Sequence, residues 1–109
     1  MTDKEFWEWC GFEYLRKGSH DKFHLLDAIR YPDGCIYSIQ PVSDLNNLFL
    51  WAEEPLVVHF IESTSSEEEY RKAYYGFLCR WLKDYIWNEP HDPAIALRKA
   101  IEEIAEALR

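Results

Sequence analysis

The stretch "DPAIALRKAIEEIAEALR", residues 92–109, constrains the fold most, because it predicts an amphipathic helix with a defined start. Asp92 is a favoured N-cap residue, and Pro93 suits the first helical position. The residues expected on the buried face recur at helical spacing, and they are Leu97, Ile101, Ile104 and Leu108. We expect the pairs Arg98–Glu102 and Lys99–Glu103 on the solvent side of a helix covering about residues 92–108.

Residues 66–87 are the longest periodic stretch and admit two interpretations. Ser65 and Glu68 fit a capping box, and the apolar residues from position 70 to position 86 keep helical spacing for four turns. Alternatively, residues 70–82 form an aromatic strand opposite residues 56–61, which Gly76 tolerates better than a helix interior. The pattern favours the helix, and the strand stays open as the alternative.

The N-terminal half predicts a short helix and a hairpin. Thr2 or Asp3 can cap a helix that ends near Gly11, at the aromatic run "FWEWCGF". "PDG" predicts the turn of a hairpin whose strands fall within residues 25–31 and 35–39.

Two further elements are expected between the hairpin and residue 66. A helix capped at Ser43 or Asp44 should run to about Ala52, and a semi-buried strand should cover residues 56–61 after Pro55. The chain therefore predicts one α+β domain over residues 1–109. We expect its helices on both faces of a small antiparallel sheet, an α/β/α sandwich-like arrangement.

Charge and cysteine content narrow the function classes. The chain has 20 acidic and 12 basic residues, a net charge of −8, and its basic residues are not clustered, so we expect no nucleic-acid binding. No secretory leader, membrane span or CxxC pair is recognisable in its sequence. We therefore expect a protein of the cytoplasm that does not enter a membrane.

Chemistry-bearing residues form no specific motif. His20 and His24 have i,i+4 spacing that can hold zinc, but no third ligand is set by spacing. Cys10, Cys35 or Cys79 could act as a nucleophile with His59 as its base, although each cysteine has an apolar context typical of an inert thiol. The acidic runs Glu53–Glu54 and Glu67–Glu69 are typical of solvated charge rather than of a glycosidase pair. We assign no catalytic residue, cofactor or metal ligand.

The aromatic surplus, 18 Trp, Tyr and Phe residues, is the feature that points to an interaction. Several rings fall outside the predicted buried stripes, and rigid rings are favoured at the centres of protein interfaces. The predicted interaction surface consists of Trp7, Tyr14, Tyr31, Tyr75 and Trp87.

Four phrases in order, "EFWEWCGF", "YPDG", "DLNNLFLWA" and "DPAIALRKAI", resemble small uncharacterised proteins of phages and prophage-like regions. That group includes the phage ABA sandwich domain family. The resemblance implies two helical layers around a small antiparallel sheet, with strands between the second and the final helix. It implies no activity, cofactor or catalytic residue.

Together these features predict a non-catalytic accessory or protein-interaction domain of phage or mobile-element origin, acting through another protein or through self-association. Two alternatives stay open. A DNA-mimic inhibitor requires acidic side chains arrayed on one face, and a small hydrolase or metal enzyme requires an assembled Cys or His site.

Overall fold

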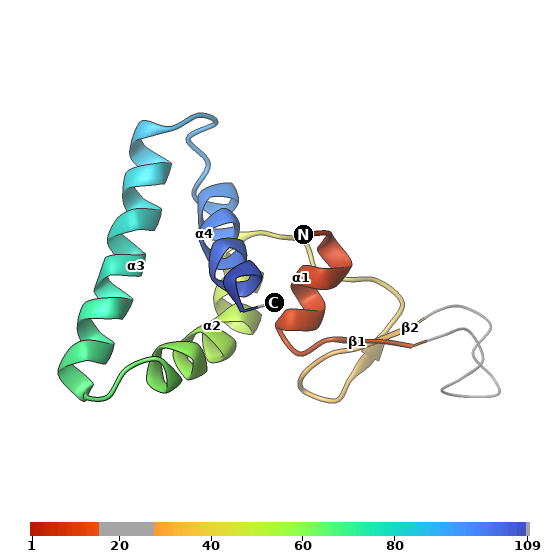
Figure 1. The fold of residues 1–109 in the computed structure, drawn as a ribbon. Helices are drawn as coiled ribbons and strands as arrows, with labels where there is room; N and C mark the ends of the chain where they lie inside the picture. The colour runs from red at the N-terminus through yellow and green to blue at the C-terminus, as the bar shows by residue number, and fades with distance from the viewer. Residues whose placement is uncertain (16–27, 109) are drawn as a thin grey trace. The chain divides into compact units, whose positions relative to one another are not determined.

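Four helices and one small antiparallel sheet make up the computed structural model, which describes residues 1–15 and 28–108 (Figure 1). In chain order the elements are α1 (Asp3–Trp9), β1 (Glu13–Leu15), β2 (Ala28–Arg30), β3 (Ile36–Tyr37), α2 (Leu45–Glu62), α3 (Glu67–Trp87) and α4 (Pro93–Ala107). The predicted α+β class and the C-terminal helix are confirmed.

The chain forms two compact units, Met1–Val42 and Ser43–Arg109. The first unit contains α1 and the sheet, and the second contains α2, α3 and α4. Within the first unit α1 contacts β1. The single domain over residues 1–109 and the helical layers on both faces of the sheet stay predictions.

Helix α1 begins and ends as its sequence predicts. The Thr2 hydroxyl accepts a hydrogen bond from the Glu5 N–H, and the Glu5 carboxylate accepts one from the Thr2 N–H, which completes a capping box. At the other end Gly11 adopts a φ of +101°, and the Phe12 N–H donates to the Trp7 carbonyl across 3.0 Å. The Phe12 and Trp7 rings also touch, the contact that accompanies this type of helix end.

The sheet has the strand order β1-β2-β3, with Ile29 of β2 opposite Tyr14 on one side and Tyr37 on the other. The "PDG" turn joins β2 to β3 as predicted. The Gly34 N–H donates to the Tyr31 carbonyl, and Gly34 has a φ of +91°. The paired strands are shorter than the predicted ranges, residues 25–27 lie outside the described residues, and β1 is a strand that the sequence analysis missed.

Helix α2 overturns one prediction. Asp44 is its N-cap, as expected, but the helix continues through Pro55 to Glu62, so the predicted strand over residues 56–61 is wrong. The physical reason is tertiary packing. Leu48, Ala52, Leu56 and Phe60 are buried at intervals of four residues, and this continuous stripe outweighs the local β-preference and the proline.

Helix α3 confirms the predicted helix and contradicts the strand over residues 70–82 that the family resemblance implied. Its N-cap is Ser66 rather than the predicted Ser65, and the Ser66 hydroxyl accepts a hydrogen bond from the Glu69 N–H. Ser65 instead donates its N–H and hydroxyl to the Glu69 carboxylate. These hydrogen bonds lower the pKa of Glu69 because they stabilise its ionised form. The Glu69 carboxylate thus holds Ser65 at the start of the helix.

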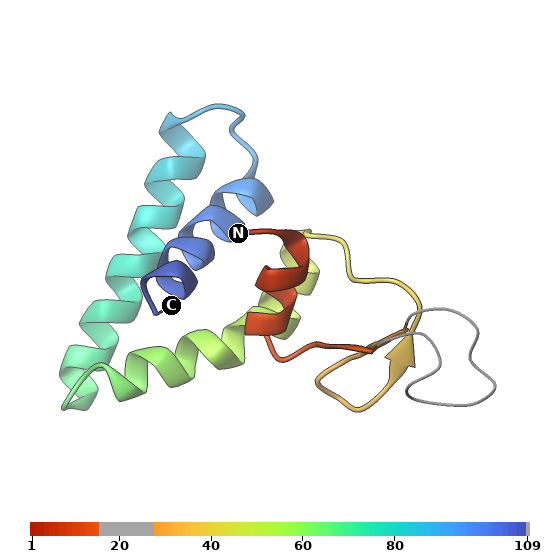
Figure 2. The same cartoon turned by 45° about the vertical axis from the view of Figure 1, so that its right-hand side comes forward.

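Helix α4 packs beside α3 and also contacts α2, so the three helices form the second unit (Figures 1 and 2). Asp92 accepts hydrogen bonds from the Ala94 and Ile95 N–H groups, as its cap role predicts. The buried face consists of Ala96, Leu97, Ala100, Ile101 and Ala105. Ile104 is half-buried and Leu108 is exposed, so the predicted stripe is wrong at its C-terminal end.

Candidate interaction surface

The five rings predicted as one surface do not form one. Tyr14 and Tyr31 are half-buried in the first unit, and Trp7 is completely buried there. Tyr75 and Trp87 are 64% and 76% exposed, and both belong to α3 in the second unit. Only α3 therefore presents predicted interaction residues as open surface.

Trp7 is a core residue, and its predicted place on a surface is wrong. Its ring lies 4.9 Å from that of Phe6 and 5.2 Å from that of Phe12, measured between centroids. No described residue accepts a hydrogen bond from its buried indole N–H. The "FWEWCGF" run thus fills the core of the first unit, with Phe6, Cys10 and Phe12 buried as well.

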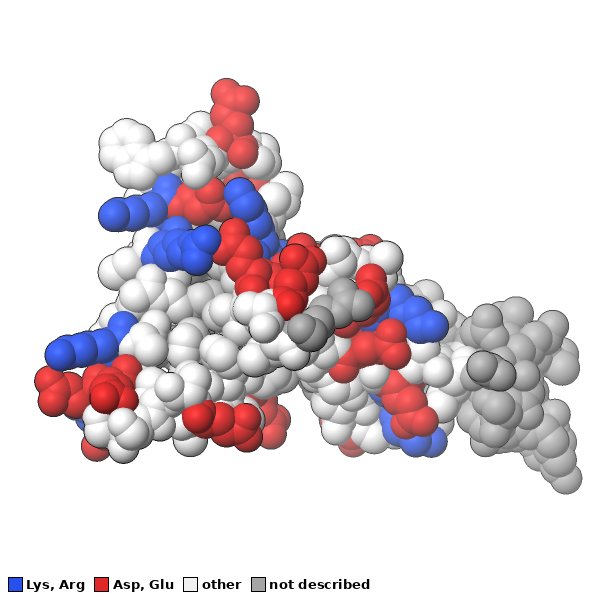
Figure 3. Space-filling view, viewed as in Figure 1, with Lys and Arg blue, Asp and Glu red and all other residues white. Residues whose placement is uncertain are grey.

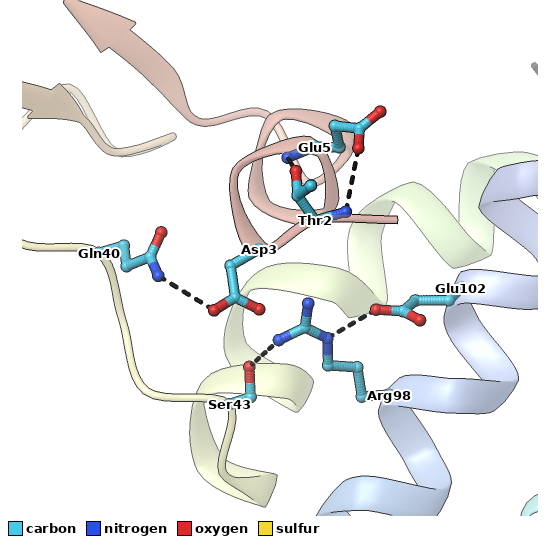
Figure 4. Close-up of polar contacts among 7 residues, drawn as sticks. All are labelled: Thr2, Asp3, Glu5, Gln40, Ser43, Arg98 and Glu102. Carbon is cyan, nitrogen blue, oxygen red and sulfur yellow. Dashed lines mark hydrogen bonds and ion pairs between the residues drawn. The ribbon is translucent and has the colours of Figure 1, made fainter.

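Tyr14 has a structural role on the same unit. Its hydroxyl donates to the Gln40 side-chain carbonyl across 2.7 Å, and the Gln40 amide donates to Asp3, as Figure 4 shows for the latter pair. Burial raises the pKa of Tyr14 to about 12, and the negative charges of Glu8 and Asp3, with Tyr31, add to the effect.

The Tyr14 phenol makes the first unit sensitive to alkali. Because its folded-state pKa of about 12 exceeds the ordinary 10.0, the folded chain holds this proton more tightly than the unfolded chain. Its contribution to stability is complete below about pH 10 and is lost as the pH rises to about 12. Ultraviolet titration of the phenolates should lose a component near pH 12 in Tyr14→Phe relative to the wild type. An unchanged component near pH 12 in Tyr14→Phe would contradict the assignment.

Helix α3 is apolar on two faces. Its inward face carries Phe77, which is buried, and Tyr74 and Trp81, which are half-buried. Its outward face carries a row that we call the α3 stripe, made up of Tyr75, Cys79, Leu82 and Ile86. All four are exposed, and their i, i+4, i+7, i+11 spacing places them on one side of the helix.

Basic side chains border the α3 stripe. Arg71 and Lys72 lie near its start and form ion pairs with Glu67 and Glu68 one turn earlier. Lys83 follows Leu82 in the sequence but lines the groove between α3 and α4, and it forms no ion pair with a described residue. The helix as a whole carries four acidic and four basic residues, so α3 is electrically neutral in a chain of net charge −8.

A groove of about 350 Å³ runs between the C-terminal half of α3 and helix α4. Across it Arg80 pairs with Glu103, and the Lys99 ammonium lies 3.9 Å from the Asp84 carboxylate. Glu103 and Lys99 thus bond to α3 instead of to each other, contrary to the predicted pair. Figure 3 shows basic and acidic side chains interspersed over α3 and α4. The two ion pairs tie these helices together.

The start of the second unit is fixed to α4 by a further pair (Figure 4). Arg98 donates to the Glu102 carboxylate across 2.8 Å and to the Ser43 hydroxyl across 2.7 Å. The Arg98 side chain is only 17% exposed, so this predicted pair is partly buried rather than on the solvent side. Its role is to anchor the N-terminal end of α2.

The candidate catalytic and metal-binding residues do not come together in the described part of the chain. His20 and His24 lie outside the described residues. Residues 1–15 and 28–108 contain no group of three or more His, Cys, Asp or Glu side chains that could hold a metal ion. His59 packs against the Phe60 ring and makes no hydrogen bond to a cysteine. Cys10 is buried, while Cys35 and Cys79 are exposed.

Comparisons with known proteins found no matching family model, curated protein or solved structure. The resemblance to the phage ABA sandwich family stays a prediction. Among the described helices, none is long and apolar enough to cross a membrane.

Proposed function

We propose that the protein is a non-catalytic protein-interaction module whose docking surface includes the α3 stripe. The observation that supports this is that α3 has a second, exposed apolar face. A helix that packs only against the core of its own chain needs a single apolar face. Fully burying one Leu or Ile side chain is worth about 1.5–3 kcal/mol. A partner that covers this half-exposed row therefore gains about 1 kcal/mol for each large side chain.

The setting that we propose is the cytoplasm of a bacterium that carries a phage or mobile element. The resemblance of the chain to phage-encoded proteins supports this setting. The low density of basic residues supports a protein partner rather than a nucleic acid.

Site-specific photo-crosslinking tests the proposal. A photoreactive amino acid replaces Leu82 in the α3 stripe, and the same amino acid replaces Ile95 in the control. Ile95 is exposed on α4 and lies outside the stripe. After irradiation in bacterial cells, we expect discrete adducts, with another protein or with a second copy, from position 82 and none from position 95. Equal labelling at the two positions, or no adduct at position 82, would overturn the proposal.

A further inference from the structure

The groove between α3 and α4 is lined by one face of each helix. Its residues on α3 have i, i+3, i+4, i+7 and i+8 spacing, and they are Arg80, Lys83, Asp84, Trp87 and Asn88. Those on α4 are Lys99, Ala100 and Glu103. Lys83 and Trp87 are exposed whereas Ala100 is buried, so the small Ala100 side chain lies at the base of the groove. A volume of about 350 Å³ is within the range of small-ligand sites.

The groove has one positive charge that no negative charge balances. Its lining includes three basic and two acidic side chains. Arg80 is paired with Glu103. Lys99 is the basic partner of Asp84, so Lys83 is left without a counter-charge. This local excess occurs in a chain with a net charge of −8, and it makes the groove a favourable place for an anion.

Several hydrogen-bond donors in the groove are not used. The Lys83 ammonium and the Trp87 indole N–H make no hydrogen bond with a described residue. The Lys99 ammonium lies 3.9 Å from the Asp84 carboxylate, which is beyond hydrogen-bond range. An ammonium has three N–H donors, an indole has one, and neither group accepts a hydrogen bond. A ligand that satisfies these groups must therefore provide acceptor oxygens.

The balance of charge favours a carboxylate over a phosphate group. A carboxylate has a single negative charge, which matches the single unbalanced charge of Lys83, and its two oxygens can accept from more than one donor. A phosphate monoester has a charge of about −1.5 to −2 at pH 7 and would leave the groove negative.

Trp87 indicates what the carboxylate is attached to. Its side chain is 76% exposed, and its ring contacts no other described aromatic ring. A second ring can pack on an indole in a stacked or edge-to-face arrangement. Lys83 and Trp87 lie one helical turn apart on the same face of α3, about 5.4 Å along its axis. A carboxylate bound to Lys83 can thus place an attached ring against Trp87.

We propose that this groove binds a carboxylate that is attached to a planar aromatic ring. The carboxylate accepts hydrogen bonds from Lys83 and Lys99, and the ring packs on Trp87. Two sources offer this chemistry, a small aromatic acid and the C-terminus of a polypeptide whose last residue is aromatic. The inference goes beyond the proposed function, because the groove contains no residue of the α3 stripe.

An NMR titration with three small compounds tests the ligand class. Phenylacetate is the probe, phenylacetamide is its neutral analogue, and acetate has no ring. We expect phenylacetate to shift the Trp87 indole N–H and the Ala100 backbone N–H saturably. The dissociation constants of the other two compounds should be at least about threefold higher. Equal affinity for phenylacetamide would overturn recognition of the charge, and equal affinity for acetate would overturn recognition of the ring.

Variants of the lining residues test the site. Lys83→Gln and Trp87→Leu should each raise the dissociation constant of phenylacetate at least about threefold, as measured at the Ala100 backbone N–H. Lys72→Gln is the control for the first, since Lys72 is exposed on the same side of α3, about 16 Å away along its axis. Tyr75→Leu is the control for the second, since Tyr75 is 64% exposed.

The two control residues do not line the groove, so both control variants should bind phenylacetate like the wild type. Circular dichroism of each variant checks that the helices are retained. If a control variant weakened binding as much as its partner in the groove, the proposed site would be overturned.

A short acetylated peptide that ends in phenylalanine separates the two sources. If this peptide binds at least as tightly as phenylacetate, and its C-terminal amide binds more weakly, the ligand is the C-terminus of a protein. If the peptide binds more weakly than phenylacetate, the ligand is a small aromatic acid. The result is independent of the proposed function, because adducts at position 82 can form whether or not phenylacetate binds.

Discussion

Leu97→Ala should lower the free energy of unfolding of the helical unit by about 3–5 kcal/mol. Leu97 is 1% exposed, and it belongs to the buried face of α4, the helix that contacts both α2 and α3. The substitution removes apolar area and leaves a cavity that the packed neighbours fill only in part. Urea unfolding followed by far-UV circular dichroism would measure the loss, because three of the four described helices belong to this unit.

Ile95→Ala is the control for this result. Ile95 lies two residues earlier on the same helix and is 54% exposed, so its truncation should change the free energy by less than about 0.5 kcal/mol. Equal losses for the two variants would show that burial does not distinguish these positions and would contradict the described core of α4.

The helix ends could be predicted because they depend on local hydrogen bonds. Thr2, Asp44 and Asp92 each accept a hydrogen bond from an N–H of the first turn, and each was among the predicted caps. The end of α1 near Gly11 could be predicted for a similar reason, because the positive φ at this position favours glycine. Such signals are contained within four or five residues and need no knowledge of the tertiary structure.

The candidate surface could be predicted only in part. Spacing placed Leu82 and Ile86 in the same apolar period as Phe77 and Trp81, and it could not separate an inward face from an outward one. A helix with apolar residues around most of its circumference gives no single stripe in sequence. To distinguish the inward face of α3 from its outward face, one must know where α2 and α4 pack against it, and this is tertiary information. Trp7 was misplaced for the related reason that its partner Phe12 lies beyond the helix end.

Pro55 explains the largest error in the predicted fold. A proline followed by "LVVHFI" is typical of a strand that begins after a break, because Pro disfavours helix interiors and β-branched residues favour strands. Burial of Leu56 and Phe60 after the proline outweighs these local preferences. The helix therefore forms although Pro55 lowers its stability, and the loss can be measured as a free energy of unfolding.

Pro55→Ala should raise the free energy of unfolding by about 2 kcal/mol. Alanine restores the N–H that can donate to the Trp51 carbonyl and removes the clash of the ring, together worth about 3 kcal/mol in a helix interior. Greater freedom of the unfolded chain and lost packing of the half-buried ring offset about 1 kcal/mol of this gain. The same urea titration would measure the difference.

Pro93→Ala is the matched control, because Pro93 occupies the first turn of α4, where its missing N–H has no intrahelical carbonyl to bind. That variant should be neutral or slightly less stable than the wild type. A gain at position 55 together with none at position 93 would show that α2 is one helix under strain from its proline. If Pro55→Ala instead lost stability, the ring would be a packing element of the helical unit, and a proline-induced bend would be required for Phe60 to reach Tyr74 and Phe77.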